Sequence, residues 1–330
     1  MRAYLLKQLI IIGLLLLLIC TSTSTFANAS TRDLSKSLVP AQKLLRDGKF
    51  DQAFILFQQY AEQDNELAQI TMGLYYKFAW GNITQDNEKA CGWFYKAALA
   101  NIPQAQKELG DCINTLQFTL KNIKQASIMK TTPFYWYNKA FDSGIYDAGC
   151  DIGRLYLGTV WQNKNIKKAI DWCLLAAEQS AISAQVTLGD IFLLDSPFQN
   201  IDNAEHWYQQ AIMRNSGEAA FKLANLYYSL SANVESKNDL LGKALIMMEK
   251  SSSLKYPSSY EKTASFYWKK LQTAEKSQAS SILAKTYLWA KTAYQVNPNE
   301  ENLKFLTMIS EEMPKTWQVS LDEQVDAFLN

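Results

Sequence analysis

A five-residue pattern recurs six times along the 330-residue chain and limits the fold more than any other feature. Each copy has a small residue, a large apolar residue four positions later, then Gly or Ala, then an apolar residue and usually an aromatic one. The Gly or Ala positions are Gly73, Gly110, Gly153, Gly189, Ala224 and Ala264, and neighbouring ones lie 35 to 43 residues apart. Self-similarity at this period predicts an array of stacked units rather than one globular core.

Each copy is followed by a second pattern, clearest at Ala90, Trp93 and Ala97. Spacings of three and four residues place both patterns on helices, so each unit is predicted to be a helix A followed by a helix B. Gly on helix A leaves room for a neighbouring helix, and Trp on helix B fills space beside it. We therefore expect an all-α fold, an α-α superhelical solenoid of stacked helix pairs.

The tryptophans divide into two groups. Four occupy the same position of helix B and are expected in the core, namely Trp93, Trp136, Trp172 and Trp207. Three others, Trp80, Trp161 and Trp268, lie off that stripe and are candidates for exposed positions.

The residues of the first unit resemble a Sel-one-like repeat of the tetratricopeptide superfamily. The match uses Ala68, Gly73, Tyr76, Asp86, Lys89, Ala90, Trp93, Ala97 and Ala98. The resemblance implies about six repeats, at residues 65–101, 102–144, 145–180, 181–215, 216–255 and 256–296. A tetratricopeptide-like helix pair is expected at residues 30–64, and capping helices are expected at 297–330, because solenoids need capped ends. Repeat two departs from the pattern at Pro133, and repeats five and six lack the glycine.

The first 29 residues are predicted to be a secretory signal peptide that is cleaved after Ala29. Arg2 and Lys7 precede an apolar run from Leu9 to Ile19, and small residues follow before Ala29. A positive start, a short apolar centre and small residues at the end are typical of such segments. Two alternatives stay open, an uncleaved anchor and a lipoprotein modified at Cys20. With export in a bacterium, the protein is expected in the periplasm or outside the cell.

The composition argues against several classes of function. Thirty-three basic and 32 acidic residues give a net charge of +1, which excludes a general electrostatic case for nucleic acid or membrane binding. A histidine-based acid–base pair or metal cluster cannot be built because the chain has one histidine, His206. No catalytic residue, metal site or cofactor site is predicted, and the chain is not expected to be an enzyme.

Four cysteines remain after the signal segment: Cys91, Cys112, Cys150 and Cys173. Their spacing fits no metal motif, and it cannot assign a disulfide. Some exported relatives of this repeat type carry a Cys pair at fixed places in each repeat, but these four occupy different repeat positions. Buried free thiols are therefore expected, with disulfides in an oxidising compartment as the alternative.

In tetratricopeptide-type arrays helix A lines the concave side, and helical geometry predicts which side chains point there. The candidate partner-binding residues are Lys107, Asp111, Arg154, Asp190, Phe221, Asn225, Tyr228 and Trp268. Apolar, aromatic and charged residues of both signs suit a protein segment better than a polyanion. Replacing Arg154 and Asp190 is expected to weaken a partner while leaving stability nearly unchanged. The alternatives are a groove with no ligand and a groove filled by the chain's own C-terminal helices.

The sequence thus predicts an exported, non-enzymatic repeat scaffold for protein–protein interaction. The resemblance implies a role in the bacterial envelope or at the interface with a host cell. A β-lactam- or peptidoglycan-binding envelope protein is the alternative. A further basic segment, residues 115–132, carries Lys121, Lys124 and Lys130 and is a lesser candidate for an acidic partner.

Overall fold

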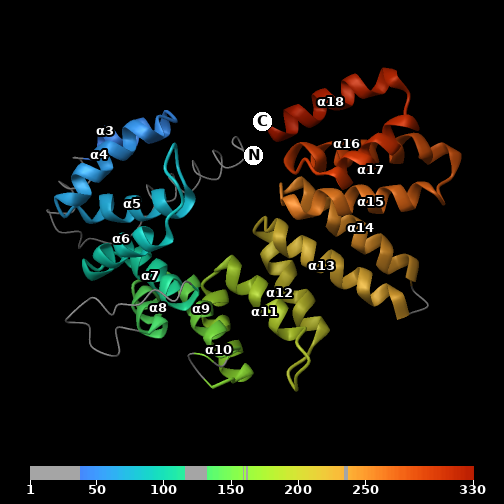
Figure 1. Cartoon of the computed structure of the whole chain (residues 1–330). Helices are drawn as coiled ribbons and strands as arrows, with labels where there is room; N and C mark the ends of the chain where they lie inside the picture. Colours follow the sequence, from blue (N-terminus) through green and yellow to red (C-terminus); the bar gives the residue numbers. More distant parts are fainter. Residues whose placement is uncertain (1–37, 116–131, 159, 161–162, 234–236) are drawn as a thin grey trace. The chain divides into compact units, whose positions relative to one another are not determined.

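The computed structural model describes residues 38–115, 132–158, 160, 163–233 and 237–330, and in these it contains sixteen α-helices, two short 3-10 helices and no strand (Figure 1). The signal segment, Trp161 and the lysines of residues 116–131 lie outside this description. The α-helices are α3 (Val39–Arg46), α4 (Phe50–Glu62), α5 (Glu66–Phe78), α6 (Asn87–Leu99), α7 (Pro103–Thr115), α8 (Pro133–Asp142), α9 (Asp147–Leu155), α10 (Ile166–Glu178), α11 (Ile182–Phe192), α12 (Ile201–Met213), α13 (Gly217–Leu230), α14 (Lys237–Ser253), α15 (Tyr260–Leu271), α16 (Lys276–Val296), α17 (Glu300–Glu311) and α18 (Lys315–Leu329).

The predicted all-α class is confirmed. Helices that follow one another in the chain pack together, as α5 does with α6, α9 with α10 and α13 with α14. The described residues divide into two compact units, one that ends at Thr187 and one that begins at Leu188.

Local sequence explains where the helices begin and where the chain reverses. Asn65, Asp86 and Asn165 each accept a hydrogen bond from a backbone N–H three residues later, which satisfies a free donor of the first helical turn. Between each helix B and the next helix A, one residue takes a left-handed conformation with φ between 60° and 91°. These residues are Asp64, Asn101, Gly144, Ser180, Asn215 and Lys255. Most are Asp, Asn or Gly, the residue types that adopt this conformation most readily.

The repeated glycines let an aromatic ring approach the backbone of helix A. A Cβ atom on Gly110 would lie 2.5 Å from the ring of Tyr137, and one on Gly73 would lie 2.3 Å from the ring of Phe94. Gly189 faces Tyr208 in the same way. At Gly153 a Cβ would meet the backbone oxygen of Ala169 at 2.8 Å and the sulfur of Cys173 at 2.9 Å. The predicted close approach at the glycine is therefore present.

The identity of the side chain that fills this space differs from the prediction. It is the residue after the tryptophan, as in Phe94, Tyr137 and Tyr208, that lies fully inside. Trp136 is also buried, but the other three tryptophans of the stripe, Trp93, Trp172 and Trp207, are only half-buried. Neighbouring residues on a helix point about 100° apart, so both cannot occupy the centre of one contact.

Trp80, expected near the surface, is 4% exposed and belongs to the core of the N-terminal unit. Its ring lies 5.1 Å from that of Tyr75 and 6.5 Å from that of Phe50. Phe50 is the first residue of α4, so this aromatic cluster packs the start of α4 against the end of α5. Trp80 follows the end of α5 and does not belong to an apolar stripe of a helix. For this reason the helical periodicity did not place it in the core.

The C-terminal helices α17 and α18 both pack on α16. Tyr287 and Lys291 of α16 contact Asp322 of α18, with the Tyr287 hydroxyl 2.8 Å from a carboxylate oxygen. Phe305 of α17 packs edge-on against the candidate residue Trp268, which is partly buried against the core of this region. None of the described helices is both long and apolar enough to cross a membrane.

Candidate partner-binding face

The eight predicted binding residues all lie on helices of the A type: α7, α9, α11, α13 and α15. We call the side of the A-type helices that carries these residues, in each unit separately, the helix-A face; it also carries Lys77, Glu108, Asp151, Thr187, Lys222, Lys262, Phe266 and Lys269. The contacts made by its charged side chains differ between the two units.

In the N-terminal unit, the face begins with an ion pair between successive repeats. Lys77 of α5 extends its ammonium to within 2.6 Å of Glu108 of α7. Glu108 also accepts a hydrogen bond from Gln104, one turn earlier on α7. The two repeats are thus bound together by a carboxylate that is almost buried.

Lys107 is the centre of the next group. Its Nζ lies 3.1 Å from Oδ2 of Asp111 and 3.1 Å from Oδ2 of Asp151, the latter an ion pair outside hydrogen-bond geometry. The hydroxyl of Tyr137, the ring that faces Gly110, donates to the second oxygen of Asp111 at 2.8 Å. Lys107 and Asp111, both predicted to meet a partner, are therefore already engaged with each other and with the next repeat.

Burial governs the ionisation of this group. It raises the pKa of the Asp151 carboxyl above its usual value, against the opposite effect of Lys107 and Arg154. Burial alone would lower the pKa of the Lys107 ammonium, but the charges of Asp151, Asp111 and Glu108 outweigh it and raise that pKa. The pKa of the Tyr137 phenol is raised by burial and by Asp111. The group is a closed polar network at the junction of two repeats.

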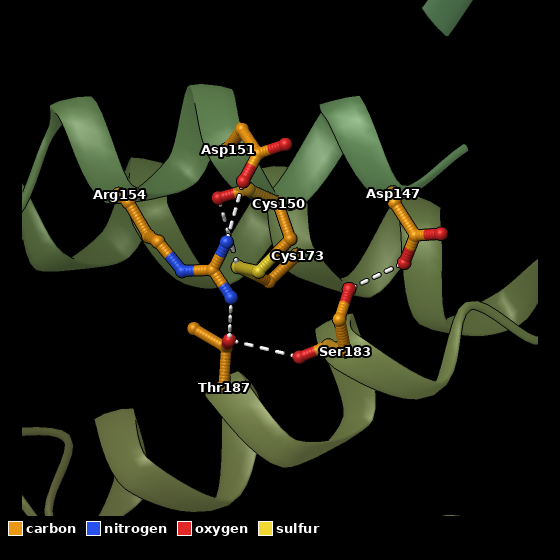
Figure 2. The surroundings of a disulfide bond; sticks show 7 residues. All are labelled: Asp147, Cys150, Asp151, Arg154, Cys173, Ser183 and Thr187. Atoms are coloured by element: carbon orange, nitrogen blue, oxygen red, sulfur yellow. Dashed lines mark hydrogen bonds and ion pairs between the residues drawn. A yellow bond between two sulfur atoms is a disulfide. The ribbon is translucent and has the colours of Figure 1, made fainter. Parts of the chain in front are cut away.

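Arg154 continues the face toward α11 (Figure 2). Its guanidinium donates to Asp151 on its own helix and to the hydroxyl of Thr187 on α11, which in turn donates to the Ser183 backbone oxygen. Ser183 also contacts Asp147 at the start of α9. Although Arg154 is 42% exposed, its charged end holds two helices together, so its replacement is no longer expected to leave stability unchanged.

Asp190 and Lys222 make the corresponding contact within the C-terminal unit. The hydroxyl of the buried Tyr208 donates to one oxygen of Asp190 at 2.7 Å, and Lys222 reaches the other at 3.0 Å. Burial and Asp190 together raise the pKa of the Tyr208 phenol. Removing Asp190 would leave this hydroxyl without its acceptor, so we now expect its replacement to lower stability.

The face changes character between α13 and α15. Lys262 of α15 lies 4.7 Å from the ring centre of Phe221 and 3.2 Å from the side-chain oxygen of Asn225. Lys269 lies 5.6 Å from the ring centre of Tyr228, which itself packs edge-on against Phe266. Tyr228 is 44% exposed. Rings and ammonium groups lie together here, and neither Lys262 nor Lys269 forms an ion pair with a carboxylate in the described part of the chain.

Sequence reasoning missed the partners that lie three residues after the small residue of each repeat. These are Glu108, Asp151, Thr187, Lys222 and Lys262, and each contacts the preceding repeat. A polar residue stands at this position in five successive repeats, which is the signal that could have identified them.

The expectation of free thiols is wrong in the structure. Cys91 and Cys112 form one disulfide and Cys150 and Cys173 form another. The first joins α6 to α7, which follows it, and the second joins α9 to α10. The pairs escaped prediction because one connects two repeats and the other lies within a repeat, so no single repeat position marks them. The second pair lies behind Arg154 and Asp151 in Figure 2.

Comparison with known proteins gives a consistent family and fold. A family model described as Sel1 repeat matches residues 67–102, 134–145, 150–180, 182–216 and 217–256. No curated protein matches the chain. Among solved structures, a Sel1 repeat protein from Oxalobacter formigenes is similar at a TM-score of 0.56 and 21% identity, over 79% of this chain and 100% of that one. A protective antigen of uropathogenic Escherichia coli with an SLR fold is similar at a TM-score of 0.54 and 20% identity, over 91% of this chain. This chain spans 60% of the length of that antigen.

Proposed function

Because the chain belongs to the Sel1 repeat family, we propose that it is an exported bacterial scaffold that binds a partner protein through the helix-A face and catalyses no reaction. The observation that carries the proposal is the composition of that face. Side chains of successive repeats meet on it, and between α13 and α15 it presents partly exposed rings beside charged groups. Aromatic residues at a protein surface are the residues that contribute most to protein–protein binding.

Export is supported by the two disulfides and by the residues of the N-terminal segment. Disulfides persist in oxidising compartments such as the bacterial periplasm and are rare in the cytosol. The proposed setting is therefore the bacterial envelope or the interface with a host cell.

The binding role is tested by site-specific photo-crosslinking in the native cell. A photoreactive phenylalanine derivative replaces Tyr228 on α13 in one strain and Ile246 on α14 in another. Both side chains are exposed, at 44% and 60%, and they lie on successive helices, one of the A type and one of the B type. We expect one defined protein adduct from position 228 and none from position 246, identified by mass spectrometry.

Equal labelling at both positions, or no adduct at either, would contradict binding through the helix-A face. Covalent labelling of the intact protein by a fluorescent penicillin would contradict the absence of catalysis and support the β-lactam-binding alternative.

Export is tested by the redox state of the thiols in the cell. Cells are quenched with acid and the denatured protein is treated with a maleimide–polyethylene glycol, with or without prior reduction. We expect four cysteines to react only after reduction, and the mature chain to begin at Ser30. Reaction of all four without reduction would place the protein in a reducing compartment.

A further inference from the structure

We propose that the surface formed by Phe221, Asn225 and Tyr228 of α13 and Lys262, Phe266 and Lys269 of α15 is a docking surface for an acidic segment of a partner protein. We call it the α13–α15 face. The inference rests on the proposed function and adds to it the chemistry of the partner.

The first argument is the charge that this face leaves unbalanced. Within the described residues, neither Lys262 nor Lys269 forms an ion pair, whereas Lys222 has Asp190 at 3.0 Å and Glu218 at 3.7 Å. Elsewhere in the unit Lys285 pairs with Glu249 and Lys291 with Asp322. On the α13–α15 face, Lys262 and Lys269 thus differ from Lys222 of the same helix-A face, which has two carboxylate partners.

The second argument is the way in which the two lysines are held. Each ammonium lies over an aromatic ring, and Lys262 also donates to Asn225. Cation–π contacts at exposed sites are weak but favourable, so they favour one position of a flexible side chain without neutralising its charge. A carboxylate that binds here would therefore meet ammonium groups that are already oriented, which reduces the entropy lost on binding.

The third argument concerns the shape of the partner segment. Lys262 and Lys269 stand seven residues apart on one helix, which corresponds to a rise of roughly 10 Å. Two carboxylates come nearest to this spacing on one face of a partner segment if they lie about seven residues apart on a helix or about four residues apart on an extended strand, where residues i, i+2 and i+4 share a face. The rings of Tyr228 and Phe266 lie beside them and offer contact to an apolar residue between the two acids.

A protein segment fits this face better than a nucleic acid or an anionic membrane does. Those polyanions bind through many basic groups, and the whole chain carries a net charge of only +1. Asn225 and the aromatic rings separate the two charges, which suits a segment with two acids and an apolar side chain.

The test uses the full mature chain and an array of immobilised peptides. Each peptide carries two Glu residues about four positions apart with one Phe or Leu midway between them, and its matched control carries Gln in place of each Glu. We expect the wild-type protein to bind a subset of the Glu peptides and none of the Gln peptides. Binding should weaken in about 0.5 M NaCl, where charges are screened beyond about 4 Å.

Two double variants separate this face from a general effect of charge. Reversing Lys262 and Lys269 to Glu is expected to weaken binding about tenfold or more, since attraction becomes repulsion. Reversing Lys250 and Lys276, which are exposed on α14 and α16, changes the net charge equally and is expected to leave binding within about twofold. Thermal unfolding of both variants checks that each remains folded.

Several outcomes would overturn the inference. These are binding of Glu and Gln peptides alike, no binding of either set, equal loss in the two double variants, or equally tight binding to single-stranded DNA or to phosphatidylglycerol vesicles. The crosslinking test at position 228 distinguishes the two proposals. If a partner is captured there but its yield is unchanged by reversal of Lys262 and Lys269, the acidic partner is wrong and the scaffold role stands. If no partner is captured at position 228, the proposed binding through the helix-A face is itself contradicted.

Discussion

The helix-A face differs between residues 66–187 and residues 217–271. In the first region, Lys77, Lys107 and Arg154 all contact a carboxylate, and several of these contacts join one repeat to the next. In the second, Lys222 also contacts carboxylates, but Lys262 and Lys269 lie over aromatic rings and form no ion pair with any residue that the structure describes. The same helix position can therefore stabilise a repeat junction or remain available for another molecule.

The two regions also differ in how they are held together. Both disulfides lie between residues 91 and 173, within the N-terminal unit. The glycine of helix A, present at Gly73, Gly110 and Gly153, is replaced by Ala224 and Ala264 in the second region. In the first region, then, the helices pack closely and are linked by disulfides, and the charged side chains of the helix-A face are paired with one another. Four experiments test this contrast with the second region.

The largest effect is expected from the disulfides. Replacing all four cysteines with Ala should lower the free energy of unfolding of the N-terminal unit by about 3 kcal/mol for each disulfide, because loops of 21 and 23 residues are no longer constrained. Urea denaturation measures the loss, and native-state hydrogen exchange locates it. Amides of α13 and α15 should keep their protection, so equal loss in both regions would contradict the contrast.

The next effect is expected at Gly153. Leu at this position would force atoms against the Ala169 carbonyl and the Cys173 sulfur, and we expect a loss of about 3 kcal/mol, at the upper end for overpacking. The control is Gly92→Leu on α6, where an added Cβ meets nothing within 4 Å. That variant should be neutral or slightly more stable because Gly is a poor helix former. Similar losses in both variants would show that helix A is not closely packed at Gly153.

A smaller loss is expected when Lys107 is replaced with Met. The almost buried Asp151 then loses one of its two cations, and we expect a cost of about 2 kcal/mol, below that of a fully buried pair because Arg154 remains. Lys262→Met is the matched control in the second region and should change stability by no more than about 0.5 kcal/mol. Both values come from urea denaturation. Equal losses in the free energy of unfolding for the two variants would contradict the difference between paired lysines in the first region and unpaired ones in the second.

The smallest effect is a pH dependence that comes from Asp151. Its raised pKa means that the folded chain keeps a proton at pH values just above about 3.9, where the unfolded carboxyl has lost it. Stability from this group therefore falls as pH rises through that window. We expect the stability of wild type relative to Asp151→Asn to decrease as the pH rises from about 3.9, measured by urea denaturation. A relative stability that increases over this window would show that Lys107 and Arg154 outweigh burial.

Much of the fold followed from the sequence because the signal is local. Small and aromatic residues spaced by three, four and five positions identify helices, and their recurrence identifies an array. The same arithmetic placed Lys107, Arg154 and Tyr228 on helix A, where the structure has them.

The errors arose where the answer depends on a second helix. The pattern could not decide between Trp93 and Phe94 as the residue that fills the space at Gly73, because the choice depends on the rotation of helix B. The cysteines could not be paired without knowing which turns of α6 and α7, or of α9 and α10, face each other.

The sequence by itself determined the all-α class, the paired helices and the residues that share one side of helix A, since these depend on spacings of a few residues along one helix. Only the tertiary structure decided which of those residues are bound to one another. The contacts from Lys77 to Glu108, from Arg154 to Thr187 and from Lys262 to Asn225 span 31, 33 and 37 residues. Their formation depends on the register in which neighbouring repeats stack, a quantity that no spacing within a repeat contains.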